Sequence, residues 1–234
     1  MLSGQKMTAR EYSVLDMPNY GPIEAARYFH LPLSTMEYWV GGGRHALVKL
    51  ASSRPSLLSF NNLVEFFVLE GLRKVHHVNM ANIRSAVGYM LNNTRSIHPL
   101  AEYEIRTEGK CVWFFREGRL INASKGGQLA FDSIVTPYLK RVSRGPKGIA
   151  EAIIPFTKKE YRNAQTESTK VVEIDPGRCF GMPVLLGSRI TTSFLAGRYR
   201  GGDSVPAIAR SYGRPMADIK EAIEWEIGKE IKAA

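Results

Sequence analysis

The sequence predicts an α+β fold that is mainly helical, with helices towards both ends and a small antiparallel β-sheet in the middle. Three patterns lead to this prediction. Apolar residues recur every three or four positions in both halves of the chain, as on the buried face of a helix. Between these stretches, residues 99–130 alternate and are rich in Ile, Val, Tyr, Phe and Trp, which is typical of strands. With 234 residues, of which 44% are hydrophobic, the chain is long enough to bury a proper core.

We expect four segments along the chain. The segment 157–170 is polar and nearly free of large apolar groups, so it is predicted to be a linker. The other three are an N-terminal winged helix-turn-helix with a helical extension over 1–98, a small antiparallel sheet with a helix over 99–156, and a C-terminal three-helix helix-turn-helix domain over 171–234.

Residues 20–40 have the spacing of a helix-turn-helix motif. His30 occupies the turn position that favours positive φ, and Pro32 pre-sets the backbone for a second helix. The predicted inner faces of the two helices carry Ala25, Phe29, Met36 and Trp39, with Leu31 at the corner. The alternative interpretation is a helical hairpin that only contributes to a core.

The outer face of the second helix is the candidate DNA reader, because this face of a helix-turn-helix lies in the major groove. Its predicted DNA-binding residues are Leu33, Ser34, Thr35, Glu37 and Tyr38. The run LPLSTMEYW resembles the recognition helix of MerR-type winged-helix regulators. In this sequence Glu37 replaces the basic residue of that pattern, so contacts with DNA are not carried over at this position.

A basic, glycine-rich stretch follows and is predicted to form the wing. Glycines 41–43 can make a tight turn, and residues 46–50 are expected to form a short strand. The side chains that would lie against the sugar-phosphate backbone are Arg44, His45, Lys49 and Arg54. The alternative is a flexible connector with solvated charges.

The middle of the chain is predicted to continue with two helices over 59–75 and 79–93 and then three short strands. Tight turns at residues 108–109 and 117–118 separate the strands, and a further helix is expected over 126–142. Trp113, Phe114 and Phe115 are either core residues or the lining of a ligand pocket.

The C-terminal segment repeats the helix-turn-helix spacing, with Gly213 at the turn. Residues that fit the inner-face pattern are Ile208, Ala209, Tyr212, Ile219 and Ala222. The outer side of its last helix is expected to expose Asp218, Glu221, Glu224 and Glu226. Such an acidic surface would be repelled by DNA and would suit a protein partner or a dimer contact.

The amino-acid composition narrows the classes of function that are expected for this chain. A net charge of +10 favours a polyanionic partner. There is no apolar stretch of membrane-spanning length and no signal peptide, so a cytoplasmic protein is expected. The two cysteines, Cys111 and Cys179, suggest neither a disulfide scaffold nor a zinc site. We find no catalytic arrangement, so the chain is predicted not to be an enzyme and to need no cofactor or metal.

Residues 172–226 resemble the small bacterial family known as domain of unknown function four-three-three, through EIDPGRCFGMPVLLGSRIT and SVPAIARSYGRPMADIKEAIEW. Such domains occur in VapB-type antitoxins. The resemblance implies a homodimeric antitoxin of a type II toxin-antitoxin pair, which neutralises a PIN-like ribonuclease toxin from the adjacent gene and represses its own operon by binding operator DNA.

Arginines of this segment are expected to pair with the carboxylates of such a ribonuclease. The nearest candidates are Arg178, Arg189, Arg198 and Arg200. The competing interpretation is a MerR-like, ligand-sensing transcription regulator without a toxin partner.

Overall fold

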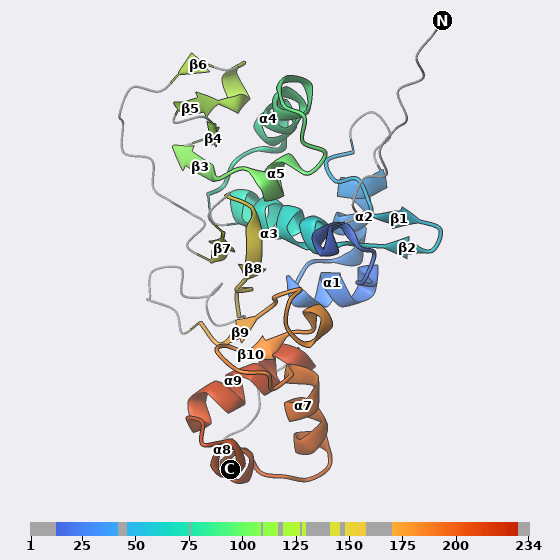
Figure 1. Ribbon diagram of the computed structural model, residues 1–234, viewed down its shortest axis with the longest axis vertical. Coiled ribbons are helices and arrows are strands. Elements are labelled where there is room, and N and C mark those ends of the chain that lie inside the picture. The colour runs from blue at the N-terminus through green and yellow to red at the C-terminus, as the bar shows by residue number, and fades with distance from the viewer. Residues whose placement is uncertain are drawn as a thin grey trace, which may run out of the picture.

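Helix α3 (Phe60–Lys74) lies at the centre of the molecule, and the other elements pack around it (Figure 1). In this computed structural model the described residues are 13–41, 46–74, 76–108, 110–116, 119–126, 128–129, 141–145, 148–157 and 170–228. Nearly every side chain of α3 is buried, including Glu65 and Glu70. The fold is mixed, with helices and small antiparallel sheets.

The N-terminal elements pack on one side of α3. They are η1 (Val14–Asp16), α1 (Pro22–Tyr28), α2 (Leu33–Gly41), β1 (Ser52–Ser53) and β2 (Ser56–Leu57). Trp39 of α2 stacks on Phe66 with ring centroids 5.9 Å apart, and Phe29 contacts Phe67 at 6.1 Å. These aromatic contacts attach the α1–α2 pair to the central helix.

A second group of elements packs on another side of α3. It consists of α4 (Met80–Asn93), α5 (Pro99–Glu102), and a four-stranded antiparallel sheet in the order β3 (Ile105–Glu108), β4 (Cys111–Arg116), β5 (Arg119–Asn122) and β6 (Gln128–Leu129), with η3 (Ala123–Lys125) before β6. The first three strands are those predicted from the alternating pattern. The fourth, β6, replaces the start of the helix predicted over 126–142, and most of that helix lies outside the described residues.

Strands β7 (Val142–Arg144) and β8 (Ala150–Ile153) form a hairpin that links the centre to the C-terminal unit. Ile153 and Ile174 exchange backbone hydrogen bonds of 3.0 and 2.9 Å. Arg144 donates to the carbonyls of Ala101, Tyr103 and Gly148, and its burial lowers its pKa to about 10. The predicted linker lies outside the described residues except at its ends, 157 and 170.

The C-terminal unit consists of a short two-stranded sheet and three helices. Its elements are β9 (Val172–Glu173), η4 (Cys179–Gly181), β10 (Val184–Leu185), α7 (Thr192–Arg200), α8 (Val205–Tyr212) and α9 (Met216–Ile227). Gly213 ends α8 with a left-handed φ of 58°, as its place in the predicted turn requires.

Helix α9 connects this unit to the N-terminal pair. Trp225 stacks on Tyr28 of α1 at 5.4 Å, and Glu226 pairs with Arg27 at 3.1 Å. Buried residues from the N-terminal, central and C-terminal segments therefore belong to one hydrophobic cluster.

Two further expectations fail in the described part of the chain. Residues 46–50 form no strand, and the hairpin lies later, at residues 52–57. The last helix does not expose an acidic side, because Glu221, Glu224 and Glu226 are buried. Each of these glutamates interacts with a neighbouring group, which makes its burial tolerable.

Candidate nucleic-acid interface

The turn between α1 and α2 has the geometry that the sequence predicted. His30 adopts φ 50°, and the Leu31 amide donates to the Ala26 carbonyl at 2.9 Å. Pro22 begins α1, and Pro32 precedes α2. The expected inner-face residues are all buried: Ala25, Phe29, Leu31, Met36 and Trp39. The alanine side chain at position 25 is fully covered, which fits a close approach of the two helices.

One side of α2 is open to solvent, and it is the side expected from the sequence. Leu33, Ser34, Glu37 and Tyr38 are exposed, while Thr35 is half-buried. Tyr38 is 53% exposed although it is aromatic, so it is available for a contact outside the chain.

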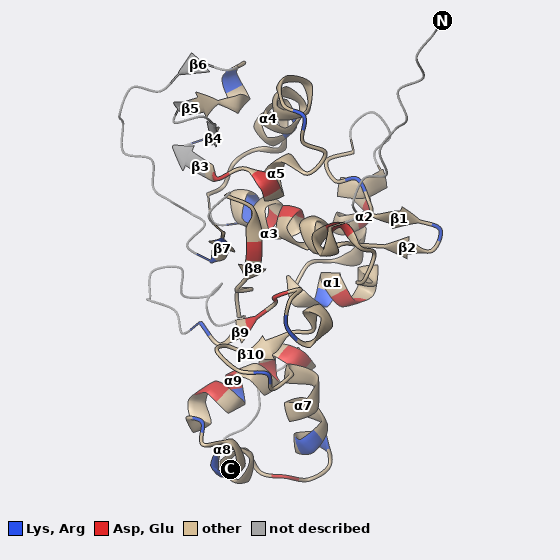
Figure 2. Ribbon diagram, viewed as in Figure 1, with Lys and Arg blue, Asp and Glu red and all other residues tan. Residues whose placement is uncertain are grey.

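The short hairpin β1–β2 projects from the molecule beside this helix (Figure 1). Ser53 pairs with Ser56, so Arg54 lies at the tip, where it is exposed. Figure 2 shows the tip as a basic point at the end of an uncharged ribbon. The position fits a contact with the sugar-phosphate backbone.

The base of the hairpin is held by one buried side chain, Asn62 of α3. Its Oδ1 accepts from the amides of Ala51 and Ser59 at 3.0 and 3.1 Å. Its Nδ2 donates to the Lys49 carbonyl at 2.8 Å, while the Lys49 side chain remains exposed. Of the other predicted wing residues, Arg44 and His45 lie outside the described part of the chain.

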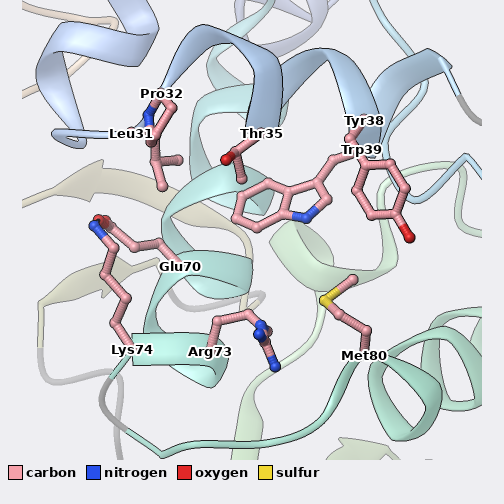
Figure 3. A pocket seen from close by; sticks show the side chains of 9 residues that line it. All are labelled: Leu31, Pro32, Thr35, Tyr38, Trp39, Glu70, Arg73, Lys74 and Met80. Carbon is pink, nitrogen blue, oxygen red and sulfur yellow. Dashed lines mark hydrogen bonds and ion pairs between the residues drawn. The ribbon is translucent and has the colours of Figure 1, made fainter.

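Sequence reasoning missed three basic residues beside α2. The Arg84 guanidinium of α4 lies 4.9 Å from the centre of the Tyr38 ring. Arg73 and Lys74, in the last turn of α3, line a cavity of about 320 Å³ that Thr35 and Tyr38 also line (Figure 3). All three are far from α2 in sequence, so neither spacing nor local charge pointed to them.

The structure fixes the two cations of this cavity in position. Lys74 pairs with buried Glu70 at 2.9 Å, and Arg73 donates to the Val78 carbonyl at 3.0 Å. Figure 3 shows Trp39 and Met80 facing the space between α2 and the ends of α3 and α4. The cavity thus combines an apolar floor with a charged rim, in which the Glu70 carboxylate balances Lys74 and Arg73 adds a positive charge.

The second helix pair is placed differently. In α9, residues 219 and 221–226 are buried, Lys220 is partly exposed, and the first turn is exposed at Met216 and Ala217. The buried part of this helix cannot lie in a DNA groove without first leaving its neighbours.

The four candidate partner-binding arginines do not form one cluster. Arg178 pairs with Glu173 at 2.6 Å and with Asp175 at 3.2 Å, and Arg198 pairs with Asp203 at 2.6 Å. Arg189 and Arg200 are exposed. Arg178 and Arg189 lie in the loops around η4 and β10, whereas Arg198 and Arg200 are in the last turn of α7.

The aromatic residues considered for a ligand pocket are placed in the core where the structure describes them. Phe114 is fully buried against Tyr89 and Tyr103, and Trp113 is 7% exposed. The Phe115 side chain lies outside the described residues. Within the described part of the chain, no three His, Cys, Asp or Glu side chains are grouped to hold a metal ion. No described helix has both the length and the apolar character to cross a membrane.

Comparisons with known proteins relate the chain to antitoxins. Residues 172–225 match the family model "Protein of unknown function (DUF433)". The chain is 27% identical over 236 residues to "Putative antitoxin VapB45" of Mycobacterium tuberculosis, and the match covers 89% of this chain and 94% of that protein. The crystal structure of Rv2018 from Mycobacterium tuberculosis has the same fold, with a TM-score of 0.60 and 21% identity over 90% of this chain and 100% of that one. These similarities support an antitoxin-like family for this chain.

Proposed function

We propose that this chain is the antitoxin of a type II toxin-antitoxin pair, which acts in the cytoplasm as a homodimer, neutralises a PIN-like ribonuclease and represses its own operon. The observation that carries the proposal is the similarity to a named antitoxin over nearly the whole of both chains. The exposed side of α2, which the fold leaves free next to a basic hairpin tip, supports the DNA-binding half.

In the proposed complex α2 lies in the major groove, where Ser34, Thr35 and Tyr38 contact base edges. Arg54 contacts a phosphate on one side of α2, and Arg84 and Arg73 lie near the backbone on the other. This arrangement explains how a helix that carries Glu37 can bind a polyanion, because the positive charge comes from its neighbours.

The DNA-binding half is tested by mobility shift with the promoter DNA upstream of the gene. Ser34→Ala combined with Tyr38→Ala should lower affinity for the promoter about tenfold or more and leave binding to unrelated duplex unchanged, since a base contact contributes ~1–3 kcal/mol. Arg54→Ala should weaken binding to every sequence and reduce the slope of log affinity against log salt by ~0.9.

Arg200→Ala is the matched control for Arg54→Ala, because it removes one exposed arginine from α7, away from α2. If the control lowers affinity and salt slope as much as Arg54→Ala, net charge and not the hairpin is responsible. Unchanged promoter affinity in the Ser34/Tyr38 double variant would exclude α2 as the reader.

The toxin half is tested by co-expression with the ribonuclease of the adjacent gene. The antitoxin role predicts that the two proteins co-purify and that this chain relieves the growth arrest caused by the ribonuclease. A regulator that binds the promoter but neither captures the ribonuclease nor relieves the arrest would favour the ligand-sensing alternative.

A further inference from the structure

An exposed aromatic side chain stands on strained backbone in the C-terminal unit. Phe180 is 87% exposed, more than any other large hydrophobic residue described in this chain. It has φ 56°, and the preceding Cys179 has φ 45°, so two consecutive residues with side chains occupy the left-handed region. Such residues persist only where the surroundings hold them, and they concentrate at functional sites.

Two residues of the N-terminal segment hold this loop. Asn19 Nδ2 donates to the Phe180 carbonyl at 2.8 Å, and the Tyr20 hydroxyl donates to the Gly181 carbonyl at 3.1 Å. Gly181 has no room for a Cβ, because that atom would collide with the Tyr20 hydroxyl. Burial raises the pKa of Tyr20 to about 12, so its hydroxyl remains a donor at neutral pH. The fold therefore fixes Phe180 in an outward position.

A groove lies directly beside the Phe180 ring. Its volume is about 220 Å³, and it is lined by Val14, Met17, Phe60 and Pro176 together with Phe180 itself. Val14 is 57% exposed and Met17 is 46% exposed, so the apolar surface continues from the ring onto η1. This volume is below the ~300–1,000 Å³ of most small-molecule pockets and suits an inserted side chain.

The charges around the ring are largely balanced within the chain. Arg178, next but one to Phe180, pairs with both Glu173 and Asp175. A surface with its own charges paired does not need an oppositely charged partner, which argues against a polyanion here. The protrusion and the groove lie side by side on one surface, as in a self-complementary contact between two identical copies.

We propose that Phe180 and the adjacent groove form an isologous dimer interface, in which the Phe180 ring of each copy fills the groove of the other. This gives a surface to the homodimer of the proposed function and rests on that dimer. The two rings would lie near the two-fold axis, where an aromatic anchor in a desolvated pocket contributes most to association.

The test measures the association of the full chain by sedimentation equilibrium. Phe180→Ser removes the ring, and Met17→Glu places a charge in the groove. Each change should raise the dimer dissociation constant at least tenfold. Phe194→Ser is the matched control, since Phe194 is 52% exposed on α7 and lies outside the groove. It should change the constant by less than threefold.

Mixing the two variants gives the sharper result. Neither homodimer keeps a ring that faces an uncharged groove, whereas the heterodimer of Phe180→Ser with Met17→Glu keeps one, in a groove that lacks only its own Phe180 ring. The mixture should therefore associate more tightly than either variant alone. Circular dichroism should show all variants folded, because Phe180 and Met17 are exposed.

Three results would overturn the proposal. If the wild-type chain is monomeric at every concentration, both this interface and the proposed homodimer fail. If the wild type is dimeric and Phe180→Ser is equally dimeric, the dimer uses another surface and the proposed function survives. If the wild type is monomeric alone but needs Phe180 to capture the ribonuclease, the surface belongs to a different partner.

Discussion

Helices α2 and α9 have the same place in two similar sequence patterns but opposite surroundings. Each follows a left-handed residue, His30 at φ 50° and Gly213 at φ 58°. Helix α2 buries one side and exposes the other, whereas α9, after an exposed first turn, is covered along most of its length by α7, α8 and α1. The periodicity of a helix thus identifies its inner face, but it does not tell whether the outer face is free.

The difference lies in what covers the outer side of each helix. For α9 the cover includes α1, whose Tyr28 and Arg27 contact Trp225 and Glu226. No described residue covers Ser34, Glu37 or the exposed part of Tyr38 in this way. The first helix pair therefore leaves one side of α2 exposed, whereas the second pair attaches the C-terminal unit to the core.

The largest expected difference in the free energy of unfolding is between removing an aromatic ring from α9 and removing one from α2. Trp225→Ala should lower the free energy of unfolding by ~3–5 kcal/mol, because it removes a buried ring stacked on Tyr28. Tyr38→Ala should lower it by less than ~1 kcal/mol, since that ring is half exposed. Urea unfolding of both variants measures the contrast, and similar losses would show that α9 is not the more deeply packed helix.

A smaller contrast is expected between two glutamates. Glu226 accepts from the Thr192 hydroxyl at 2.6 Å and pairs with Arg27, while Glu37 is exposed. Glu226→Ala should reduce stability by ~1.5–3 kcal/mol, and Glu37→Ala by no more than ~0.5 kcal/mol. Combining Glu226→Ala with Arg27→Ala in a double-mutant cycle gives the coupling, and its absence would mean that the ion pair contributes nothing.

The smallest expected effect is a pH dependence of the free energy of unfolding. It arises at α3, the helix that supports α2. His98 Nδ1 lies 2.9 Å from Glu65 Oε2, and Nε2 lies 3.6 Å from Asp16. Burial lowers the pKa of His98, but the hydrogen bond and the charges of Glu65, Asp16 and Glu102 more than offset this, so its pKa is raised. Burial also raises the pKa of Glu65.

Both shifts mean that the folded chain holds protons more tightly than the unfolded chain. The stabilisation from His98 is complete below its unfolded pKa of ~6.5 and is lost as the pH rises through its higher folded value. The Glu65 shift acts in the same direction, from ~4.5 upwards. The free energy of unfolding should therefore begin to fall above pH ~4.5 through Glu65 and fall further above pH ~6.5 through His98, by at most ~1.4 kcal/mol per pH unit for each proton.

His98→Gln should flatten this pH dependence, because it removes the group that titrates near neutrality. Arg27→Ala is the control. It removes the ion pair with Glu226 of α9, which should not change how the free energy of unfolding depends on pH in this range. An equal slope in the wild type and His98→Gln would assign the pH dependence to other groups.

Local patterns in the sequence predicted local structure well. The helix–turn–helix spacing of residues 20–40, the left-handed His30 and the buried inner face follow from short-range sterics and periodicity, and the structure has all of them. The strands over 105–122 follow from the alternation. The pattern predicts a strand over residues 46–50, whereas the described hairpin pairs residues 52–53 with 56–57 around Arg54 and Pro55.

Long-range contacts could not be predicted in this way. Glutamates 221, 224 and 226 are charged residues in a helix, a pattern that predicts a surface position, yet all three are buried. Glu226 is paired with Arg27 of a distant segment, and Glu224 with Lys220 of the same helix. Arg84 beside Tyr38 was missed for the same reason. The groove at Phe180 joins residues that are more than 150 positions apart, and no local pattern connects them.

The contact between α1 and α9 also has a consequence for synthesis. A ribosome makes Tyr28 of α1 long before Trp225 of α9, so during much of translation the Tyr28 ring has no Trp225 to cover it. Nascent chains usually fold unit by unit from the N-terminus, but here α1 cannot be completed as a buried element until α9 has left the exit tunnel. A ribosome that stalls before codon 225 would therefore release a product with an exposed aromatic surface, and such a fragment should be a preferred substrate for chaperones and proteases.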